Sequence, residues 1–123
     1  MDTTAIKELL QLYFDASFES DGEKMAKVFH DAAHIYGHGG DGDLADAPKA
    51  PFVTMVSSFP PGSSDPAFVR DDEILSIDFT GENTAIARVR LRMENIVFTD
   101  VLSLICIGGN WSVISKLYSG VPI

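Results

Sequence analysis

Basic residues are scarce in this sequence. The 123-residue chain carries 9 lysines and arginines against 18 aspartates and glutamates, which gives a formal net charge of −9. Nucleic acids and anionic membranes need a basic footprint on a protein partner, so the charge argues against both as partners. The length is that of one domain, and we treat residues 1–123 as a single unit that can bury a core and still hold a ligand cavity.

Long apolar runs and cysteine pairs are missing as well. No stretch approaches the ~18 apolar residues that span a bilayer, and the first residues have neither the basic nor the apolar part of a signal peptide. From these absences we expect a cytoplasmic location. The single cysteine, Cys106, cannot form an internal disulfide. Its place in a strand pattern favours a small buried side chain over a nucleophile.

Alternating residues dominate the second half of the chain. Four such runs, at residues 74–79, 84–93, 96–107 and 111–118, are separated by short turn sequences. Runs of period two that are joined by tight turns predict an antiparallel meander.

The first half has helical periodicity instead. Apolar spacing predicts helices at about residues 3–18, 22–30 and 49–59. Between the second and third helices we expect a short strand at 33–36 and a glycine-rich loop at 37–43, with Asp46-Ala47-Pro48 leading into the third helix. The proline-rich residues 60–66 connect this half to the meander. Helices followed by a sheet predict an α+β domain.

Several short motifs together resemble a known family. They are Tyr13-Phe14, Phe29-His30-Asp31-Ala32-Ala33, Gly42/Leu44, the run 76–81, Phe98-x-Asp100-x-Leu102-x-Leu104 and Gly109-x-Trp111-x-Val113-x-x-Lys116-x-Tyr118. The chain resembles the nuclear transport factor 2-like superfamily, and within it the SnoaL-like branch called putative lumazine-binding proteins. The resemblance implies a cone-shaped, curved antiparallel sheet with three N-terminal helices on its concave face. The superfamily includes isomerases, dehydratases, cyclases, epoxide hydrolases and proteins that only bind ligands.

The turns predict how the strands pair. A two-residue turn at Glu94-Asn95 places Leu91 opposite Phe98. A three-residue turn at 108–110 places Asp100 opposite Tyr118 and Leu102 opposite Lys116. A two-residue turn there would send Asp100 and Lys116 to opposite faces, because a slip of one residue flips every side chain. The three-residue turn gives a helix-covered face with these members: Val89, Leu91, Phe98, Asp100, Leu102, Leu104, Ile114, Lys116 and Tyr118.

Asp100 and Lys116 are two charges among leucines on that face. As diagonal neighbours they are close enough for an ion pair, and a partly desolvated pair in a pocket suits acid/base chemistry or polar recognition. A structural salt bridge that only fixes the strand register explains the pair equally well. We predict that the ligand-contacting side chains are Tyr13, Phe14, Phe52, Phe98, Lys116 and Tyr118.

Tyr13 and His34 are further candidates. Tyr13 matches a position from which some isomerases of the superfamily donate a hydrogen bond to a substrate oxygen, and a core aromatic is the alternative. The acids that those isomerases carry are replaced here by Gly37 and Ser103, which argues against ketosteroid isomerisation. His34 is a candidate general base at the pocket rim, with an exposed or packed imidazole as the alternative. His30, His34 and His38 do not share a helix, so we predict no metal centre.

Arg88, Arg90 and Arg92 lie at period two on the opposite face. Carboxylates at Glu73 and Asp71 fall opposite two of them, which favours surface ion pairs over an anion-binding stripe. The same predicted face carries Val97, Val101, Ile105, Trp111, Val113 and Leu117. This is too much apolar surface to leave in water, so we expect a homodimer that buries it sheet to sheet.

Two functions fit these residues. One is a small-molecule-binding domain with a hydrophobic pocket between helices and sheet. The other is a cofactor-independent lyase, isomerase or dehydratase acting on a small cyclic organic substrate, with Asp100 or His34 as the base and Lys116 tuning Asp100. No metal or nucleotide cofactor is implied in either case. Only one carboxylate is evident in the pocket, which favours the binding domain.

Overall fold

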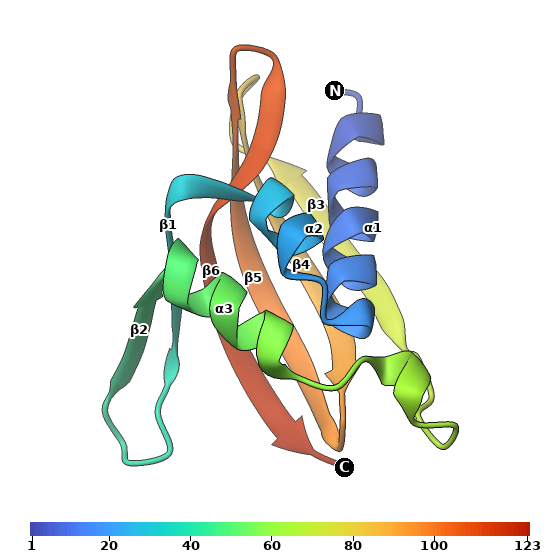
Figure 1. Ribbon diagram of the computed structural model, residues 1–123. Helices are drawn as coiled ribbons and strands as arrows, with labels where there is room; N and C mark the ends of the chain where they lie inside the picture. The colour runs from blue at the N-terminus through green and yellow to red at the C-terminus, as the bar shows by residue number, and fades with distance from the viewer.

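Three helices pack against one side of a six-stranded sheet (Figure 1). The structure is a computed structural model that describes all residues, 1–123. The helices are α1 (Thr4–Glu19), α2 (Gly22–Val28) and α3 (Lys49–Ser58), with a short 3₁₀ helix η1 (Gly62–Ser64). The strands are β1 (Phe29–His38), β2 (Leu44–Pro48), β3 (Asp72–Phe79), β4 (Thr84–Met93), β5 (Ile96–Ile107) and β6 (Asn110–Pro122).

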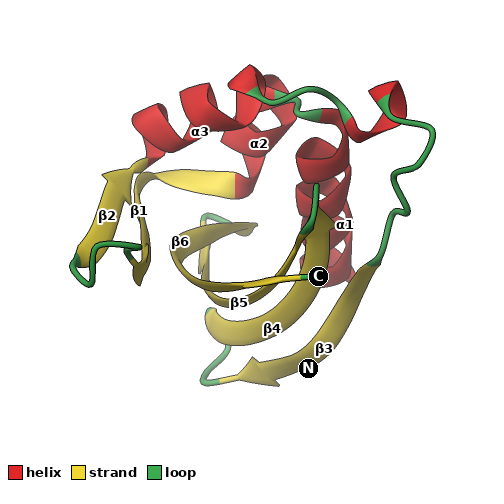
Figure 2. Cartoon of the chain, turned by 90° about the horizontal axis from the view of Figure 1, so that it is seen from below, coloured by secondary structure: helices red, strands yellow, loops and turns green.

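The sheet is curved, and the helices lie on its concave side (Figure 2). This confirms the α+β class and the predicted layer of helices. The strand order is β2-β1-β6-β5-β4-β3. The sheet is mixed rather than wholly antiparallel, because β1 runs parallel to β6 at the point where the meander meets the first strand. None of the helices is long and apolar enough to cross a membrane.

The glycine-rich region differs from the prediction. β1 runs on to His38, and β2 pairs antiparallel with it, with Asp46 opposite Tyr36. The predicted loop is therefore only the turn of a hairpin, and Asp46-Ala47-Pro48 lies in its edge strand, whose last residue, Pro48, is also the N-cap of α3. Proline is tolerated there because the end of an edge strand needs no further ladder hydrogen bond.

The meander pairs as predicted across the Glu94-Asn95 turn between β4 and β5. Leu91 lies opposite Phe98, and Val89 lies opposite Asp100. Asp100 also lies opposite Tyr118, and Leu102 opposite Lys116. The pairing of β5 with β6 is thus the predicted one here, but the three-residue turn from which it was derived is wrong. Ile107 pairs with Asn110, so the turn has two residues, Gly108 and Gly109, both with positive φ.

A β-bulge restores the register between β5 and β6. Ser103 pairs with Ser115 and Leu104 pairs with Val113, which leaves Ile114 as the extra residue on β6. Residues from Ser115 onward therefore keep the faces that a three-residue turn would give, whereas residues before Ile114 exchange faces. Val113 is consequently fully buried, and Trp111 packs against the core with its ring centroid 6.0 Å from that of Phe79. The prediction that Trp111 and Val113 lie on the outer face is wrong.

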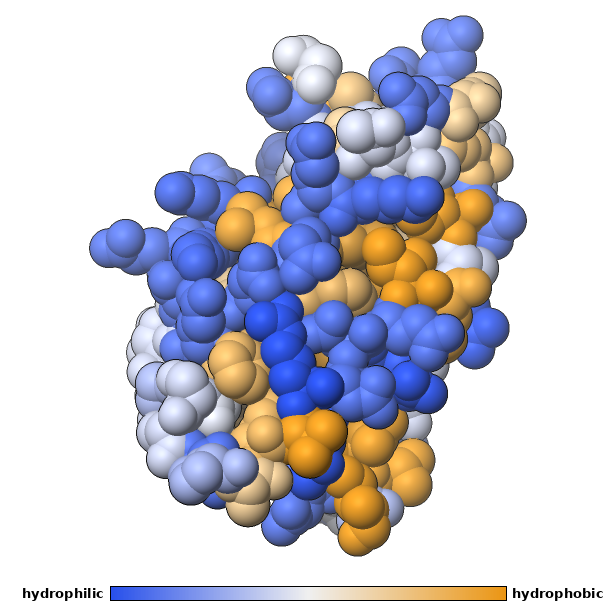
Figure 3. Space-filling model, turned by 90° about the vertical axis from the view of Figure 1, so that its right-hand side faces the viewer, coloured by the Kyte–Doolittle hydropathy of each residue, from blue (hydrophilic) through white to orange (hydrophobic).

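A connector of residues 59–71 joins α3 to β3. Arg70 holds it in place by ion pairs to Asp15 on α1 at 2.6 Å and to Asp72 at 2.7 Å. The ring of Phe68 packs against Phe18 with 5.5 Å between centroids. Figure 3 looks onto this side of the molecule, where hydrophilic and apolar surface alternate. The connector thus lies against α1 and closes one side of the space between helices and sheet.

Candidate functional site

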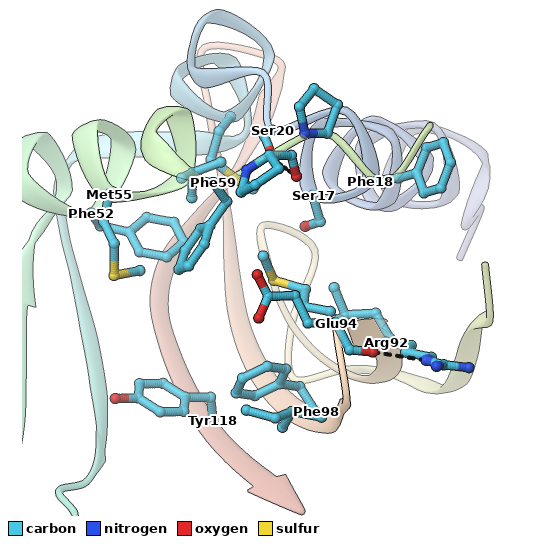
Figure 4. Close-up of a pocket in the computed structure, with 18 of the residues that line it drawn as sticks. Ser17, Phe18, Ser20, Phe52, Met55, Phe59, Arg92, Glu94, Phe98 and Tyr118 are labelled. Carbon is cyan, nitrogen blue, oxygen red and sulfur yellow. Dashed lines mark hydrogen bonds between the residues drawn. The ribbon is translucent and has the colours of Figure 1, made fainter. Parts of the chain in front are cut away.

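A cavity of about 900 Å³ lies between the helices, the connector and the sheet. Its wall is mostly apolar and aromatic. Phe52 and Met55 from α3, with Phe59 just after that helix, face Phe98 and Tyr118 from the sheet across the open space (Figure 4). Ser17, Phe18 and Ser20, at the end of α1, border it on another side. This volume lies within the range of pockets that enclose small organic ligands.

The charged group deepest in the wall is Lys116. Its side chain is only 11% exposed, and its Nζ atom lies 3.9 Å from Oδ2 of the fully buried Asp100. The same ammonium lies over three aromatic rings, at 4.8 Å from the centroid of Phe52, 5.3 Å from that of Tyr13 and 5.7 Å from that of Tyr118. A cation among ring faces is stabilised by their negative potential, and more strongly when water is excluded.

Asp100 lies behind Lys116 and does not line the cavity. Its Oδ2 atom accepts a hydrogen bond of 2.6 Å from the hydroxyl of Tyr13, which is itself fully buried. Its Oδ1 atom is buried and has no hydrogen-bond partner. A buried carboxylate oxygen without a partner is costly, so Asp100 depends on Tyr13 and Lys116 for compensation.

Burial has the largest effect on the pKa values of Tyr13 and Lys116. It raises the pKa of Tyr13 well above the ordinary value, and the negative charge of Asp100 and the hydrogen bond to it act in the same direction. Burial lowers the pKa of Lys116, while the charge of Asp100 opposes that shift. Lys116 therefore loses its proton more readily than a surface lysine does.

Tyr118 owes its position to a glycine on the neighbouring strand. Gly37 on β1 pairs with Tyr118, and a Cβ atom added at Gly37 would lie 2.3 Å from the phenol ring. The ring therefore lies directly over the bare backbone of β1. On its other side it meets Phe98 edge to face, with 6.1 Å between centroids. Only glycine lets the ring approach the strand this closely.

The structure brings together four of the six predicted ligand-contacting residues on the cavity wall: Phe52, Phe98, Lys116 and Tyr118. Tyr13 and Asp100 form the second layer behind Lys116. Phe14 is 4% exposed and lies in the core, with its ring centroid 6.0 Å from that of Tyr13. The assignment of Phe14 to the pocket is wrong, because its side chain is packed in the core and does not line the cavity.

His34 lies outside the cavity. Its neighbours Ala33 and Ile35 are buried, and side chains alternate along a strand, so the imidazole points to the opposite face of β1. There its Nδ1 atom lies 2.8 Å from Oδ1 of Asp46, and its ring stacks on Tyr36. The proposal of His34 as a pocket-rim base is therefore wrong, and it forms no dyad with Asp100.

The arginines divide into two kinds. Arg90 forms an ion pair with Glu73 at 2.9 Å on the outer face, as the strand pairing predicted. It also pairs at 3.2 Å with Asp71, whose predicted partner was Arg92. Arg92 reaches the edge of the cavity wall, where its Nε atom donates to the backbone oxygen of Glu94 and its guanidinium lies over Phe68. No three His, Cys, Asp or Glu side chains come together in a way that could hold a metal ion.

Sequence reasoning missed the part of the wall built from irregular chain. Residues Phe59–Phe68 of the connector contribute many of its members, and the turn Glu94-Asn95 contributes two more. No periodic pattern marks such segments. The one available signal was the two aromatic residues, Phe59 and Phe68, in a stretch otherwise rich in proline, glycine and serine.

Comparison with known proteins places the chain in a family. The profile of the family described as "Putative lumazine-binding" matches residues 1–119. The chain belongs to this family. None of the curated proteins matches the chain. The putative lumazine-binding family is thus the level at which the sequence can be identified.

Solved structures support the same placement in the NTF2-like superfamily. An NTF2-like protein of unknown function from Shewanella baltica OS155 is 29% identical, with a TM-score of 0.86 over 97% of this chain and 93% of that one. A second NTF2-like protein of unknown function, from Methylobacillus flagellatus KT, is 30% identical, with a TM-score of 0.76 over 95% of this chain and 90% of that one. A ketosteroid isomerase-like protein from Erwinia carotovora atroseptica SCRI1043 is 15% identical, with a TM-score of 0.74 over 97% and 95%, and shares the fold alone.

Proposed function

We propose that the protein binds a small organic molecule with a flat apolar body and one oxygen-bearing end, such as a carboxylate or a carbonyl. The observation that carries this proposal is the nearly buried ammonium of Lys116 at the end of an apolar cavity of about 900 Å³. Such pockets use apolar walls for affinity and a few fixed polar groups for orientation.

The arrangement suggests how the ligand lies. Its polar oxygen accepts a hydrogen bond from Nζ of Lys116, which Asp100 and the three rings hold in place. Its body then lies between Phe52 on the helix side and the Phe98–Tyr118 pair on the sheet side. The pocket selects size and shape, whereas Lys116 selects the end that enters first.

Equilibrium dialysis with two matched probes tests this binding mode. 2-Naphthoate has the carboxylate and 2-methylnaphthalene lacks it. We expect Lys116→Met to weaken naphthoate binding by about 10- to 100-fold, the value of a lost hydrogen bond to a charged group, and to leave methylnaphthalene binding unchanged. The control Arg90→Gln, on the outer face, leaves both within about threefold, because a surface ion pair contributes ~0–1 kcal/mol. If the wild-type protein bound neither probe, the proposal would be ruled out.

Acid/base catalysis without a cofactor is the second candidate function. It is favoured by the Tyr13–Asp100–Lys116 chain of contacts, with the unpartnered Oδ1 atom of Asp100 at its centre. Because Asp100 is shielded from the cavity, Lys116 is the group that meets a substrate, and Asp100 acts through it. Conversion of a cyclic ketone with exchange of its α-hydrogens for deuterium, abolished by Lys116→Met, would distinguish catalysis from binding.

We also propose a homodimer through the outer face of the sheet, although without Trp111 and Val113. One row of paired residues crosses this face from β4 to β2: Arg88, Val101, Leu117, Tyr36 and Asp46. The row is positive at one end, apolar and aromatic in the middle and negative at the other. Leu117 at its centre is 55% exposed. A second copy related by a twofold axis parallel to the strands would place Leu117 against its own copy and Arg88 against Asp46.

A further inference from the structure

We propose that Lys116 forms a covalent imine with an aldehyde or ketone that occupies the cavity. This inference rests on the proposed ligand pocket and names a chemical class for it. A lysine amine forms such a bond when it is reachable from a pocket, shielded from water and close to a group that can exchange a proton with it. Lys116 meets these three conditions by its place in the structure.

Access and shielding come from the position of Nζ. Lys116 is part of the cavity wall, yet its side chain is only 11% exposed. Around it, α3 contributes the ring of Phe52, α1 contributes the ring of Tyr13, and β1 contributes Ile35, its buried partner across the strand pair. Asp100 is the one charged group against it. An incoming carbonyl therefore meets the amine in a largely dry environment.

Proton exchange is provided by Asp100. Its Oδ2 atom is held by Tyr13 and lies 3.9 Å from Nζ, while its buried Oδ1 atom has no partner. Tyr13 keeps the carboxylate oriented and remains protonated because burial raises its pKa. When the Lys116 side chain moves Nζ from 3.9 Å to within hydrogen-bond distance of Oδ2, Asp100 can accept a proton from the ammonium and return it later.

The reaction balances within this group. The ammonium gives a proton to Asp100, and the free amine forms a C–N bond to the carbonyl carbon. The π electrons of the carbonyl move to its oxygen, which takes a proton from the now positively charged nitrogen to give the neutral carbinolamine. The C–O bond then breaks as the nitrogen lone pair forms C=N, and the hydroxyl leaves as water with the proton that Asp100 returns. Ammonium plus carbonyl has become iminium plus water, and the positive charge stays beside Asp100 and the rings.

The other four lysines are unsuited to this chemistry. Lys24 is paired with Glu19 at 2.7 Å, which raises its pKa, and Lys49 is paired with Asp31 at 2.9 Å. Lys7 and Lys27 are exposed on helices. Burial lowers the pKa of Lys116, so a larger share of its amine is unprotonated than in a surface lysine.

The test is reductive trapping with 2-naphthaldehyde and cyanoborohydride on the full chain, followed by peptide mapping. We expect one naphthylmethyl group per chain on Lys116, formed before any other lysine is labelled, because the cavity holds the naphthyl body beside this amine. Lys116→Met should lose that adduct, whereas Lys24→Met, a matched surface control, should keep it.

Binding of 2-methylnaphthalene separates this inference from the pocket itself. This probe has the same body and no carbonyl. If the wild-type protein binds it and naphthaldehyde labels only surface lysines or the N-terminus, the imine is overturned and the pocket stands. If the wild-type protein binds neither 2-methylnaphthalene nor 2-naphthoate, the proposed function fails as well. Because mapping on the wild-type protein decides the outcome, the test does not depend on the folding of Lys116→Met.

Discussion

At the scale of single residues, the buried group of Tyr13, Asp100 and Lys116 links stability to the candidate site. Asp100 is fully buried, and both of its partners come from other elements, one from α1 and one from β6. Removing a single member leaves the charges or polar atoms of the others unpaired in a region of low polarity. Replacing all three by apolar side chains of similar volume leaves no unpaired charge or polar atom.

Asp100→Ala should therefore lower the free energy of unfolding by ~3–5 kcal/mol, because it leaves an ammonium and a phenol hydroxyl unpaired among apolar side chains. The triple variant Tyr13→Phe, Asp100→Leu, Lys116→Met should recover much of this loss. Urea denaturation followed by circular dichroism measures both. If the triple variant were no more stable than Asp100→Ala, the stability lost in Asp100→Ala would not come from unpaired charged and polar groups.

Tyr13 should make stability depend on alkaline pH. Burial raises its pKa in the folded state well above the ordinary value of 10.0, so folding favours the protonated phenol. That contribution is fully present below pH 10 and is lost as the pH rises above it, because the unfolded chain then ionises, at ~1.4 kcal/mol per pH unit.

The measurement is the free energy of unfolding of the wild-type protein and of Tyr13→Phe between about pH 9 and about pH 11. The free energy of unfolding should fall more steeply with pH for the wild-type protein than for Tyr13→Phe. The difference in stability between the two proteins therefore narrows as the pH rises. Tyr36→Phe, at a partly exposed position outside the core, is the control and should follow the wild-type slope. Parallel curves for the wild-type protein and Tyr13→Phe would contradict the prediction.

Gly37 should matter more than the other glycines of its region. Gly37→Ala places a Cβ atom where the ring of Tyr118 now lies, so the ring must move into the cavity. We expect a loss of ~1–3 kcal/mol, the usual cost of overpacking, together with weaker binding of 2-methylnaphthalene. Gly40→Ala, where nothing lies within 4 Å of the new atom, is the control and should change neither quantity. Thermal unfolding and dialysis report on the two effects.

At the scale of elements, β6 shows what sequence reasoning could and could not reach. Asp100 and Lys116 were correctly placed on one face, but by assuming a three-residue turn. The real turn has two residues, and the bulge at Ile114 supplies the missing offset. A bulge is set by local twist and packing rather than by any residue type at that position. The side chains beyond the bulge could therefore be predicted, and those before it, Trp111 and Val113, could not.

Deletion of Ile114 tests the role of the bulge. Val113 already pairs with Leu104 and Ser115 with Ser103, so removal of the extra residue leaves an unbroken ladder in which Lys116 and Tyr118 keep their faces. We expect a folded chain that still binds 2-methylnaphthalene, by circular dichroism and dialysis. Deletion of Leu117, beyond the bulge, is the contrasting variant, because it places Tyr118 opposite Val101 on the outer face and should abolish binding of the probe. An Ile114 deletion that unfolds or loses the probe would contradict this account.

Other elements followed from the sequence to different degrees. Helix α1 and strands β4 and β5 were predicted closely because each carries a long, regular pattern. Strand β2 was missed because Asp46 and Pro48 are typical of a helix start, and only its pairing with β1 makes it a strand. The parallel contact between β1 and β6 joins segments distant in sequence, which no local pattern reveals. His34 was misplaced for the same reason, since its face depends on that contact.

At the scale of the whole molecule, the proposed dimer makes a prediction about charge. Arg88 of one copy should face Asp46 of the other, so Arg88→Glu and Asp46→Arg should each weaken association by placing like charges together. The double variant restores an opposite pair and should recover it. Sedimentation velocity at micromolar concentration compares the four proteins, and Leu117→Asp, at the centre of the row, should abolish the dimer. If the wild-type protein sediments as a monomer, the dimer proposal is wrong.

The cavity is built from two kinds of chain, and this has an evolutionary consequence. Lys116, Tyr118 and the residues behind them lie on strands and a helix whose register fixes them, so a substitution there acts on folding and on the ligand together. Much of the remaining wall comes from the connector and the Glu94-Asn95 turn, which add little to the sheet ladder. Mutations in these segments can change ligand preference at small cost in stability. New ligand preferences can thus arise on this fold by substitutions in its irregular segments, without disturbing the polar end of the pocket.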